Sequence, residues 1–195
     1  MKLSILICTI TSRKMKFNVL LNHLNYLIKK DKYENDVEIL FIEDQKQMTI
    51  GDKRQRLLEM AKGQMICYID DDDWVPSYYL KKILEVIKPD VDCIGFKIDC
   101  NINGKQESAI ASNIYDCWCE DRDGYKHCRT PYHKTPVKRS IALQIGFNRD
   151  MRFGEDALYS KQLKQSGLIK KEEFIPFVLY KYTYIYERNK YGDGK

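Results

Sequence analysis

The fold is decided by the stretch Met65-Ile66-Cys67-Tyr68-Ile69-Asp70-Asp71-Asp72-Asp73-Trp74-Val75-Pro76. Its first five residues are all apolar or aromatic, which predicts a short strand buried on both faces of a sheet. Four aspartates follow where that strand ends. Open α/β sheets bind ligands beyond the carboxyl ends of their strands, so these carboxylates lie where a functional site is expected.

Strands and helices alternate on both sides of this stretch. Buried strands are predicted at residues 3–10, 37–42, 65–69 and 91–98, and amphipathic helices at residues 14–30, 51–62 and 76–88. Such alternation implies right-handed crossovers between neighbouring strands. The first half of the chain therefore predicts an α/β fold with a mainly parallel central sheet flanked by helices.

The pattern weakens after residue 98. A turn is expected at residues 101–104, and residues 105–132 have no clear period. Thr135 and Pro136 have the residue types of a helix cap and a first helical position, which predicts a helix reaching Ile145. A further helix is predicted at residues 155–165, a strand at 174–186 and a solvated tail at 187–195.

Composition limits the class of protein. The 195 residues favour one compact domain, and no apolar run reaches the length of a membrane span. The apolar stretch at the amino terminus is too short for a signal peptide. The seven cysteines are an odd number, which favours free thiols in a reducing compartment, so we expect the protein in the cytoplasm. The net charge of +5 suits an enzyme acting on phosphorylated substrates better than a dedicated nucleic-acid binder.

The four aspartates require a physical explanation. At 4 Å and an effective dielectric constant of 20, each pair of like charges costs about 4 kcal/mol. Hard oxygen ligands at a sheet edge suit Mg²⁺ or Mn²⁺ bridging to a diphosphate, and in extended geometry Asp70 and Asp72 share one face. The alternative is a solvated acidic turn that caps the helix expected at Pro76.

Two further segments carry charge at expected helix starts. In Gly154-Glu155-Asp156, a carboxylate can act as a general base, or both can simply favour the helix dipole. In Lys53-Arg54-Gln55-Arg56, the cations can bind an anion together with amides of the helix terminus, or form a solvated helix face.

Taken in order, these segments resemble the GT-A-fold glycosyltransferases of the family 2 type, in particular the small stand-alone enzymes of bacteriophages and large DNA viruses. The resemblance covers about residues 3–165. It is carried by Thr9–Arg13, Gly51–Gly63, Tyr68–Pro76, His133–Arg139, Gly146-Phe147 and Phe153–Asp156.

The resemblance implies transfer of a sugar from a nucleotide diphosphate donor, with inversion and with a UDP-sugar favoured. Asp72 would bind Mn²⁺ or Mg²⁺, and Asp70 would contact the donor's ribose or the metal shell. Asp156 would be the general base, with Glu155 shaping the acceptor pocket. His133 would complete the metal shell or contact the diphosphate.

Further residues would bind the donor. Thr9 would lie near the nucleotide and Arg54 near the nucleobase or diphosphate, with Arg13, Lys53 and Asp71 beside them. The family often carries an Asp-Asp pair after the second strand, where this chain has Glu43-Asp44.

The single domain would then divide into a nucleotide-sugar-binding half at residues 1–98 and an acceptor-binding half at 99–186. The acceptor would be a glycan, a protein, a lipid or a modified nucleobase. A viral enzyme would act in the host cytoplasm. The sequence does not indicate an oligomeric state.

Three alternatives stay open. A sugar nucleotidyltransferase usually has a glycine-rich loop after the first strand, whereas residues 9–13 contain no glycine. The 14 tyrosines and the basic charge are compatible with a nucleic-acid-binding or DNA-modifying protein. A zinc site would use Cys117, Cys119, His127 and Cys128, although their spacing differs from that of common zinc sites.

Overall fold

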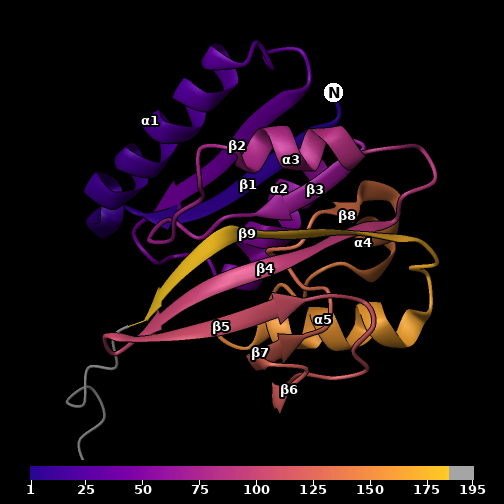
Figure 1. The fold of residues 1–195 in the computed structure, drawn as a ribbon. Coiled ribbons are helices and arrows are strands. Elements are labelled where there is room, and N and C mark those ends of the chain that lie inside the picture. The colour runs from indigo at the N-terminus through magenta and orange to yellow at the C-terminus, as the bar shows by residue number, and fades with distance from the viewer. Residues whose placement is uncertain (185–195) are drawn as a thin grey trace, which may run out of the picture.

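The computed structural model describes residues 1–184, which form a mixed sheet flanked by helices (Figure 1). The strands are β1 (Leu3–Ile10), β2 (Val37–Asp44), β3 (Met65–Tyr68), β4 (Cys93–Ile102), β5 (Lys105–Ala111), β6 (Cys119–Arg122), β7 (Tyr125–Arg129), β8 (Val137–Lys138) and β9 (Glu172–Tyr184). The helices are α1 (Lys14–Lys30), α2 (Ile50–Met60), α3 (Tyr79–Val86), α4 (Arg139–Ile145) and α5 (Glu155–Ser166), with a 3₁₀ turn at Thr11–Arg13.

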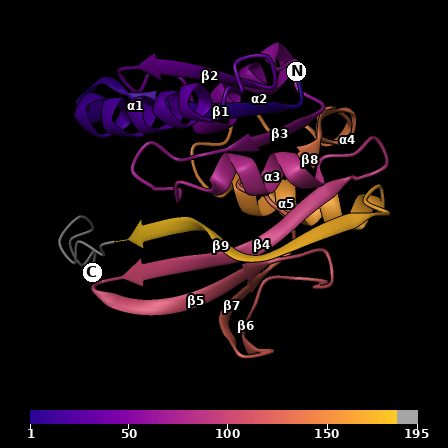
Figure 2. The same ribbon diagram turned by 45° about the horizontal axis from the view of Figure 1, so that its top comes forward.

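The described strands follow the order β2-β1-β3-β8-β4-β5-β7-β6, and β9 also pairs with β4. As predicted, β1, β2 and β3 are parallel. The short strand β8 lies between β3 and β4 and is antiparallel to both, and β5 is antiparallel to β4. The predicted α/β architecture is therefore confirmed, but the parallel arrangement is limited to part of the sheet. Figures 1 and 2 show β6 and β7 at the end of the sheet far from α1.

Alternate residues of the central strands point to two separate cores. Ile5 and Cys67 pack in one core with the apolar side of α1 and with α3. Leu6 and Tyr68 pack in the other with α2, α4 and α5. This alternation explains why the central strands are apolar at every position: both faces of the sheet are covered.

Two predicted helix starts are wrong. Trp74 forms backbone hydrogen bonds with Lys181 of β9, so the chain stays extended through Pro76 and α3 begins at Tyr79. Pro136 precedes β8 rather than a helix, and α4 begins at Arg139. In both places pairing with a strand far away in the sequence prevails over a local helix signal.

The segment without a clear period, residues 105–132, contains β5, β6 and β7. The predicted turn at residues 101–104 is shorter than expected, because β4 continues to Ile102. Asn103 and Gly104 have φ of 52° and 82°, which is the geometry of a two-residue hairpin turn. The predicted tail and the last two residues of the predicted strand at 174–186 lie outside the described residues. Within residues 1–184, no helix is long and apolar enough to cross a membrane.

Gly63 lets β3 lie close against β1. Its amide donates to Ser4 Oγ over 2.8 Å, and a Cβ at this position would lie 2.5 Å from the amide nitrogen of Ser4. The close backbone approach leaves no room for a side chain.

We expect Gly63→Ala to lower the free energy of unfolding by about 1–3 kcal/mol, because the added methyl group pushes two backbones apart. Urea unfolding measures this change. Lys62→Ala, at the exposed neighbouring position, is the control and should stay within about 0.5 kcal/mol of the wild type. Equal stability of Gly63→Ala and wild type would contradict the steric explanation.

Candidate active site

The four aspartates form a tight turn directly after β3. The amide of Asp73 donates to the carbonyl of Asp70 over 3.1 Å, and Asp71 and Asp72 occupy the turn between them. The expectation of an extended segment with Asp70 and Asp72 on one face is therefore wrong. The turn directs Asp71 and Asp72 toward Arg13, and Asp70 and Asp73 toward Lys134.

Asp71 and Asp72 face the end of β1. Thr9 Oγ1 donates to Asp71 over 2.7 Å and Arg13 Nη1 over 2.9 Å, and the Asp71 side chain is buried. Burial raises the pKa of Asp71, which the two hydrogen bonds oppose. Arg13 Nη1 also lies 3.3 Å from Asp72, whose side chain is 30% exposed. Of the two carboxylates, Asp72 is the more exposed, whereas Asp71 lines the smaller of the two cavities described below.

Asp73 holds the turn in place through buried hydrogen bonds. It is buried and accepts hydrogen bonds from Lys134 Nζ at 2.6 Å and from the Tyr180 hydroxyl at 2.8 Å. Burial raises the pKa of Asp73 to about 6, against the effect of Lys134. These contacts tie the turn to β9 and to the segment between β7 and β8.

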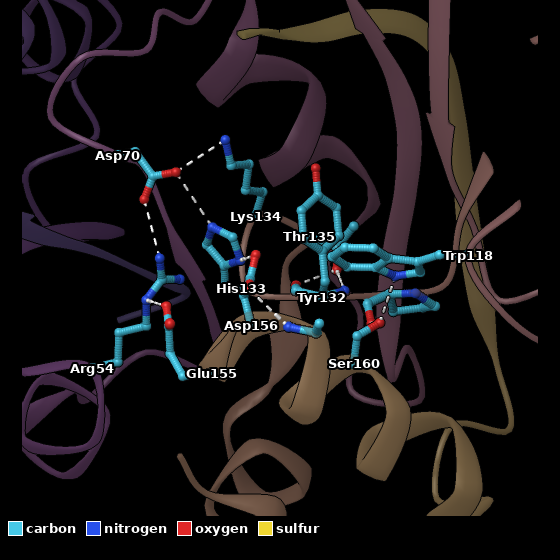
Figure 3. A network of polar contacts seen from close by, with 12 residues as sticks. Arg54, Asp70, Trp118, Tyr132, His133, Lys134, Thr135, Glu155, Asp156 and Ser160 are labelled. Atoms are coloured by element: carbon cyan, nitrogen blue, oxygen red, sulfur yellow. Dashed lines mark hydrogen bonds and ion pairs between the residues drawn. The ribbon is translucent and has the colours of Figure 1, made fainter. Parts of the chain in front are cut away.

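Asp70 is the carboxylate with the most cationic neighbours (Figure 3). Its oxygens lie 3.0 Å from Lys134 Nζ, 3.3 Å from Arg54 Nη2 and 3.4 Å from His133 Nε2. Burial opposes its ionisation, but Lys134, followed by His133 and Arg54, holds the pKa of Asp70 well below its ordinary value. The carboxyl is therefore ionised at neutral pH.

Arg54 links the aspartate turn to the start of α5. Its buried guanidinium lies 5.3 Å from the ring centroid of Tyr68, and its Nε lies 3.1 Å from Glu155 Oε1. Its Nη1 is buried and has no hydrogen-bond partner within the described residues. Glu155 is also buried, and burial raises its pKa while Arg54 opposes the shift. Glu155 thus forms a buried ion pair with Arg54.

Asp156 follows on the first turn of α5, after Gly154 with φ of 75°. Its side chain is 30% exposed, and its Oδ2 lies 3.7 Å from His133 Nδ1, a buried nitrogen without a hydrogen-bond partner among the described residues. Burial, followed by the Arg54 guanidinium, lowers the pKa of His133 to about 4, so this ring is neutral at neutral pH. Asp156 is thus the more accessible of the two carboxylates at the start of α5.

Two neighbouring cavities meet at the aspartate turn. The smaller, of about 340 Å³, includes Thr9, Arg13, Lys53 and Asp71 in its wall. The larger, of about 720 Å³, is lined by Arg54, Asp70, His133, Lys134, Glu155 and Asp156, and by the aromatic side chains of Trp118, Tyr132 and Tyr182. Ile50 and Arg152 line both cavities.

The predicted donor-binding residues divide between these cavities. Lys53 is buried, donates to the Thr9 carbonyl over 2.6 Å and forms an ion pair with Asp44. Burial alone would raise the pKa of Asp44, but the hydrogen bond from Lys53 outweighs it and the pKa is lowered. Glu43 lies beside Thr9 in the paired strands, and neither Glu43 nor Asp44 lines the smaller cavity. Arg54 lines the larger cavity instead.

The structure brings Asp70, His133 and Asp156 together, whereas Asp72 contacts Arg13. Within the described residues, no three His, Cys, Asp or Glu side chains converge in a geometry that could hold a metal ion. This finding covers the predicted zinc ligands too: Cys117 is exposed, and His127 Nε2 lies 2.7 Å from Glu107.

Sequence reasoning missed several residues of the site. Lys134 and Tyr180 hold the aspartate turn, and Trp118 lies in the larger cavity with its Nε1 donating to Ser160 over 3.0 Å. Lys134 directly follows His133, which was predicted. A lysine next to a candidate site residue is the only local signal for this contact.

Comparisons with known proteins point to one family. A family model described as "Glycosyl transferase family 2" matches residues 27–163, well over half of the chain. No curated protein matches the chain.

Solved structures of TarS from S. aureus have a similar fold. TarS 1-349 matches with a TM-score of 0.65 and 18% identity over 94% of this chain and 60% of that one. Its complex with UDP-GlcNAc matches with a TM-score of 0.64 and 17% identity, over 94% of this chain and 58% of that one. The longer TarS structure matches with a TM-score of 0.64 and 16% identity, over 94% of this chain and 37% of that one. This chain thus spans less than two thirds of the TarS chains it matches.

The family match and the likeness of fold confirm the predicted GT-A α/β fold. They also favour glycosyl transfer over nucleotidyl transfer and over nucleic-acid binding as the activity. The chain belongs to glycosyl transferase family 2.

Proposed function

We propose that this enzyme transfers a sugar from a nucleotide diphosphate donor, with a UDP-sugar favoured, to a hydroxyl group of an acceptor. The observation that carries the proposal is that Asp70 and Asp156 line one cavity, with His133 between them, while the aspartate turn also borders a second cavity. A donor and an attacking hydroxyl can therefore meet at one place. Similar TarS structures are described as complexes with UDP and with UDP-GlcNAc.

The donor would lie across both cavities. The smaller cavity, beside Thr9 and Lys53, suits the nucleoside, and the larger one suits the sugar and the acceptor. Most of the smaller cavity's wall comes from residues 8–71, which supports a nucleotide-binding role for residues 1–98. Much of the larger cavity's wall comes from residues 98–184, which supports an acceptor-binding role for residues 99–186.

A divalent cation beside the aspartate turn would have few protein ligands, because no three such side chains converge within the described residues. The carboxylates of Asp44, Asp70–Asp73, Glu155 and Asp156 outnumber the cations Arg13, Lys53, Arg54 and Lys134, and a diphosphate would add further negative charge. Asp72 would hold Mn²⁺ or Mg²⁺ through its partly exposed carboxylate together with oxygens of the donor diphosphate, and Asp70 and His133, which contact each other, would be the further protein ligands. When bound, the ion would act as a Lewis acid toward the departing diphosphate.

Asp156 would act as the general base. It would take the proton of the acceptor hydroxyl while that oxygen bonds to the anomeric carbon of the donor sugar. The bond from this carbon to the diphosphate breaks in the same displacement, and the nucleoside diphosphate leaves with the bonding electrons. Attack opposite to the leaving group inverts the anomeric centre. Glu155 would contribute by holding Arg54 beside Asp70.

The acceptor would bind among the aromatic side chains of the larger cavity. Trp118 and Tyr132 lie there edge to face, 5.7 Å apart, and Tyr182 also lines the wall. The acceptor is proposed to be a glycan, a protein, a lipid or a modified nucleobase. The likeness to stand-alone viral enzymes, and action in the cytoplasm, also stay predictions.

We expect one class of nucleotide sugar to stabilise the enzyme against heat in the presence of Mn²⁺. At a concentration of 100 times the dissociation constant, the melting temperature should rise by roughly 5–10 °C. A thermal-shift screen of UDP-, GDP- and dTDP-sugars, each with Mn²⁺ and with EDTA, measures this. If none of them shifts the melting temperature, the proposed function is wrong.

We expect Asp72→Ala to abolish the part of donor affinity that depends on Mn²⁺, because the carboxylate that would hold the ion is lost. Titration calorimetry of the donor with and without Mn²⁺ tests this. Asp90→Ala removes an exposed carboxylate outside both cavities and should behave like the wild type. Unchanged Mn²⁺-dependent affinity in Asp72→Ala would rule out Asp72 as the ligand.

We expect Asp156→Asn to bind the donor normally and to transfer sugar about 10²–10⁴ times more slowly, because an amide cannot accept the proton. Single-turnover rates together with donor affinity separate the two effects. Asp150→Asn, in the loop preceding α5, is the control and should keep its rate. A normal rate in Asp156→Asn would assign the base to another group.

A further inference from the structure

Two residues, Ile50 and Arg152, belong to the walls of both cavities. In a nucleotide sugar the diphosphate joins the nucleoside to the sugar. If the nucleoside occupies the smaller cavity and the sugar the larger, as proposed above, the diphosphate passes the shared wall. Of the two shared residues, Arg152 is the one that carries charge.

The backbone around Arg152 is fixed. The Gly51 amide donates to the Met151 carbonyl over 3.0 Å, and Thr49 Oγ1 donates to the Arg149 carbonyl. A Cβ on Gly51 would lie 1.9 Å from the Asn148 carbonyl oxygen, so the loop packs closely against the start of α2. The loop therefore presents Arg152 at a defined place beside the cavities.

The guanidinium of Arg152 is bound weakly. It is exposed, and its Nη1 and Nη2 donate to the carbonyls of Lys46 and Gln47 over 3.3 and 3.4 Å. No carboxylate of the described residues forms an ion pair with it. Of the other arginines in the cavity walls, Arg13 and Arg54 contact carboxylates within 3.3 Å. Arg129 lines the larger cavity alone, where it lies over the Trp118 ring and donates to the carbonyls of Cys119 and Cys128. Arg152 is thus the arginine shared by both cavities, and it can exchange its two carbonyl partners for an anion at low cost.

We propose that Arg152 binds the diphosphate of the donor, exchanging the two carbonyls for phosphate oxygens. This inference rests on the proposed function. A guanidinium matches two phosphate oxygens with two parallel hydrogen bonds. When the bond between the anomeric carbon and the diphosphate breaks, the leaving oxygen gains negative charge, and Arg152 stabilises it without giving up a proton. No carboxylate of the described residues pairs with Arg152, so its charge is available to the diphosphate.

The test compares nucleotides that differ by one phosphate. Calorimetry with Mn²⁺ measures the affinities of the wild type, Arg152→Gln and Arg152→Lys for UDP and UMP. In Arg152→Gln we expect UDP affinity to fall about tenfold to a hundredfold, the loss that follows from removing charged hydrogen bonds. UMP affinity should fall much less, so the ratio of UDP to UMP affinity collapses. Arg152→Lys should restore part of it.

Arg149→Gln is the matched control. Arg149 lies three positions earlier in the same loop, pairs with Asp52 and Glu59, and lines neither cavity. Its substitution should leave the UDP-to-UMP ratio unchanged. An equal loss of the ratio in Arg149→Gln would show that loop position, rather than the Arg152 charge, is responsible, and would overturn the proposal.

Two negative outcomes are distinguishable. If the wild type binds UDP and Arg152→Gln keeps the wild-type ratio, the assignment of Arg152 is wrong while the proposed function stands. If the wild type binds no nucleotide diphosphate or nucleotide sugar at all, the proposed function itself fails, and the assignment fails with it.

Discussion

The site depends on the neutralisation of four consecutive carboxylates at the end of a buried strand. Because they lie in a turn, three cations from different parts of the chain reach them. Arg13 after β1 contacts Asp71 and Asp72, Arg54 on α2 contacts Asp70, and Lys134 before β8 contacts Asp70 and Asp73. Without these partners, the mutual repulsion of the carboxylates would oppose folding at the place where the sheet must end. The same partners fix where an incoming ligand can bind, since they leave Asp72 the more open of the pair that faces β1.

Helix α2 and helix α5 meet at this turn through one buried ion pair. Arg54 and Glu155 both line the larger cavity, and both side chains are buried. An ion pair of this kind adds little net stability, but it holds both groups in a defined geometry. Asp156, the next residue, thereby gains a fixed position relative to Asp70. The Arg54–Glu155 ion pair therefore positions Asp156 without having to contact the substrate.

Much of this arrangement could be predicted from local sequence. The run that ends at Asp73 locates the sheet edge, and the helix beginning at Glu155 was predicted at its observed start. The conformation of the aspartates was predicted wrongly, because alternation along a strand says nothing about where pairing stops. Lys134 and Tyr180 escaped prediction for another reason: Tyr180 meets Asp73 across 107 residues, and no local pattern encodes that contact. Glu155 was expected to shape the acceptor pocket and lines the larger cavity, so this role stays a prediction. Its buried contact with Arg54 joins distant parts of the chain and has no local signal in the sequence.

Strand β9 adds the last partners to the turn. Its residues hydrogen-bond with Trp74, and the Tyr180 hydroxyl reaches both the Asp73 carboxylate and the Asp70 amide. During synthesis the aspartates leave the ribosome long before β9 exists, and contacts of such long range form slowly. The carboxylates of the four aspartates therefore lack some of their final partners until nearly all the described residues have been translated.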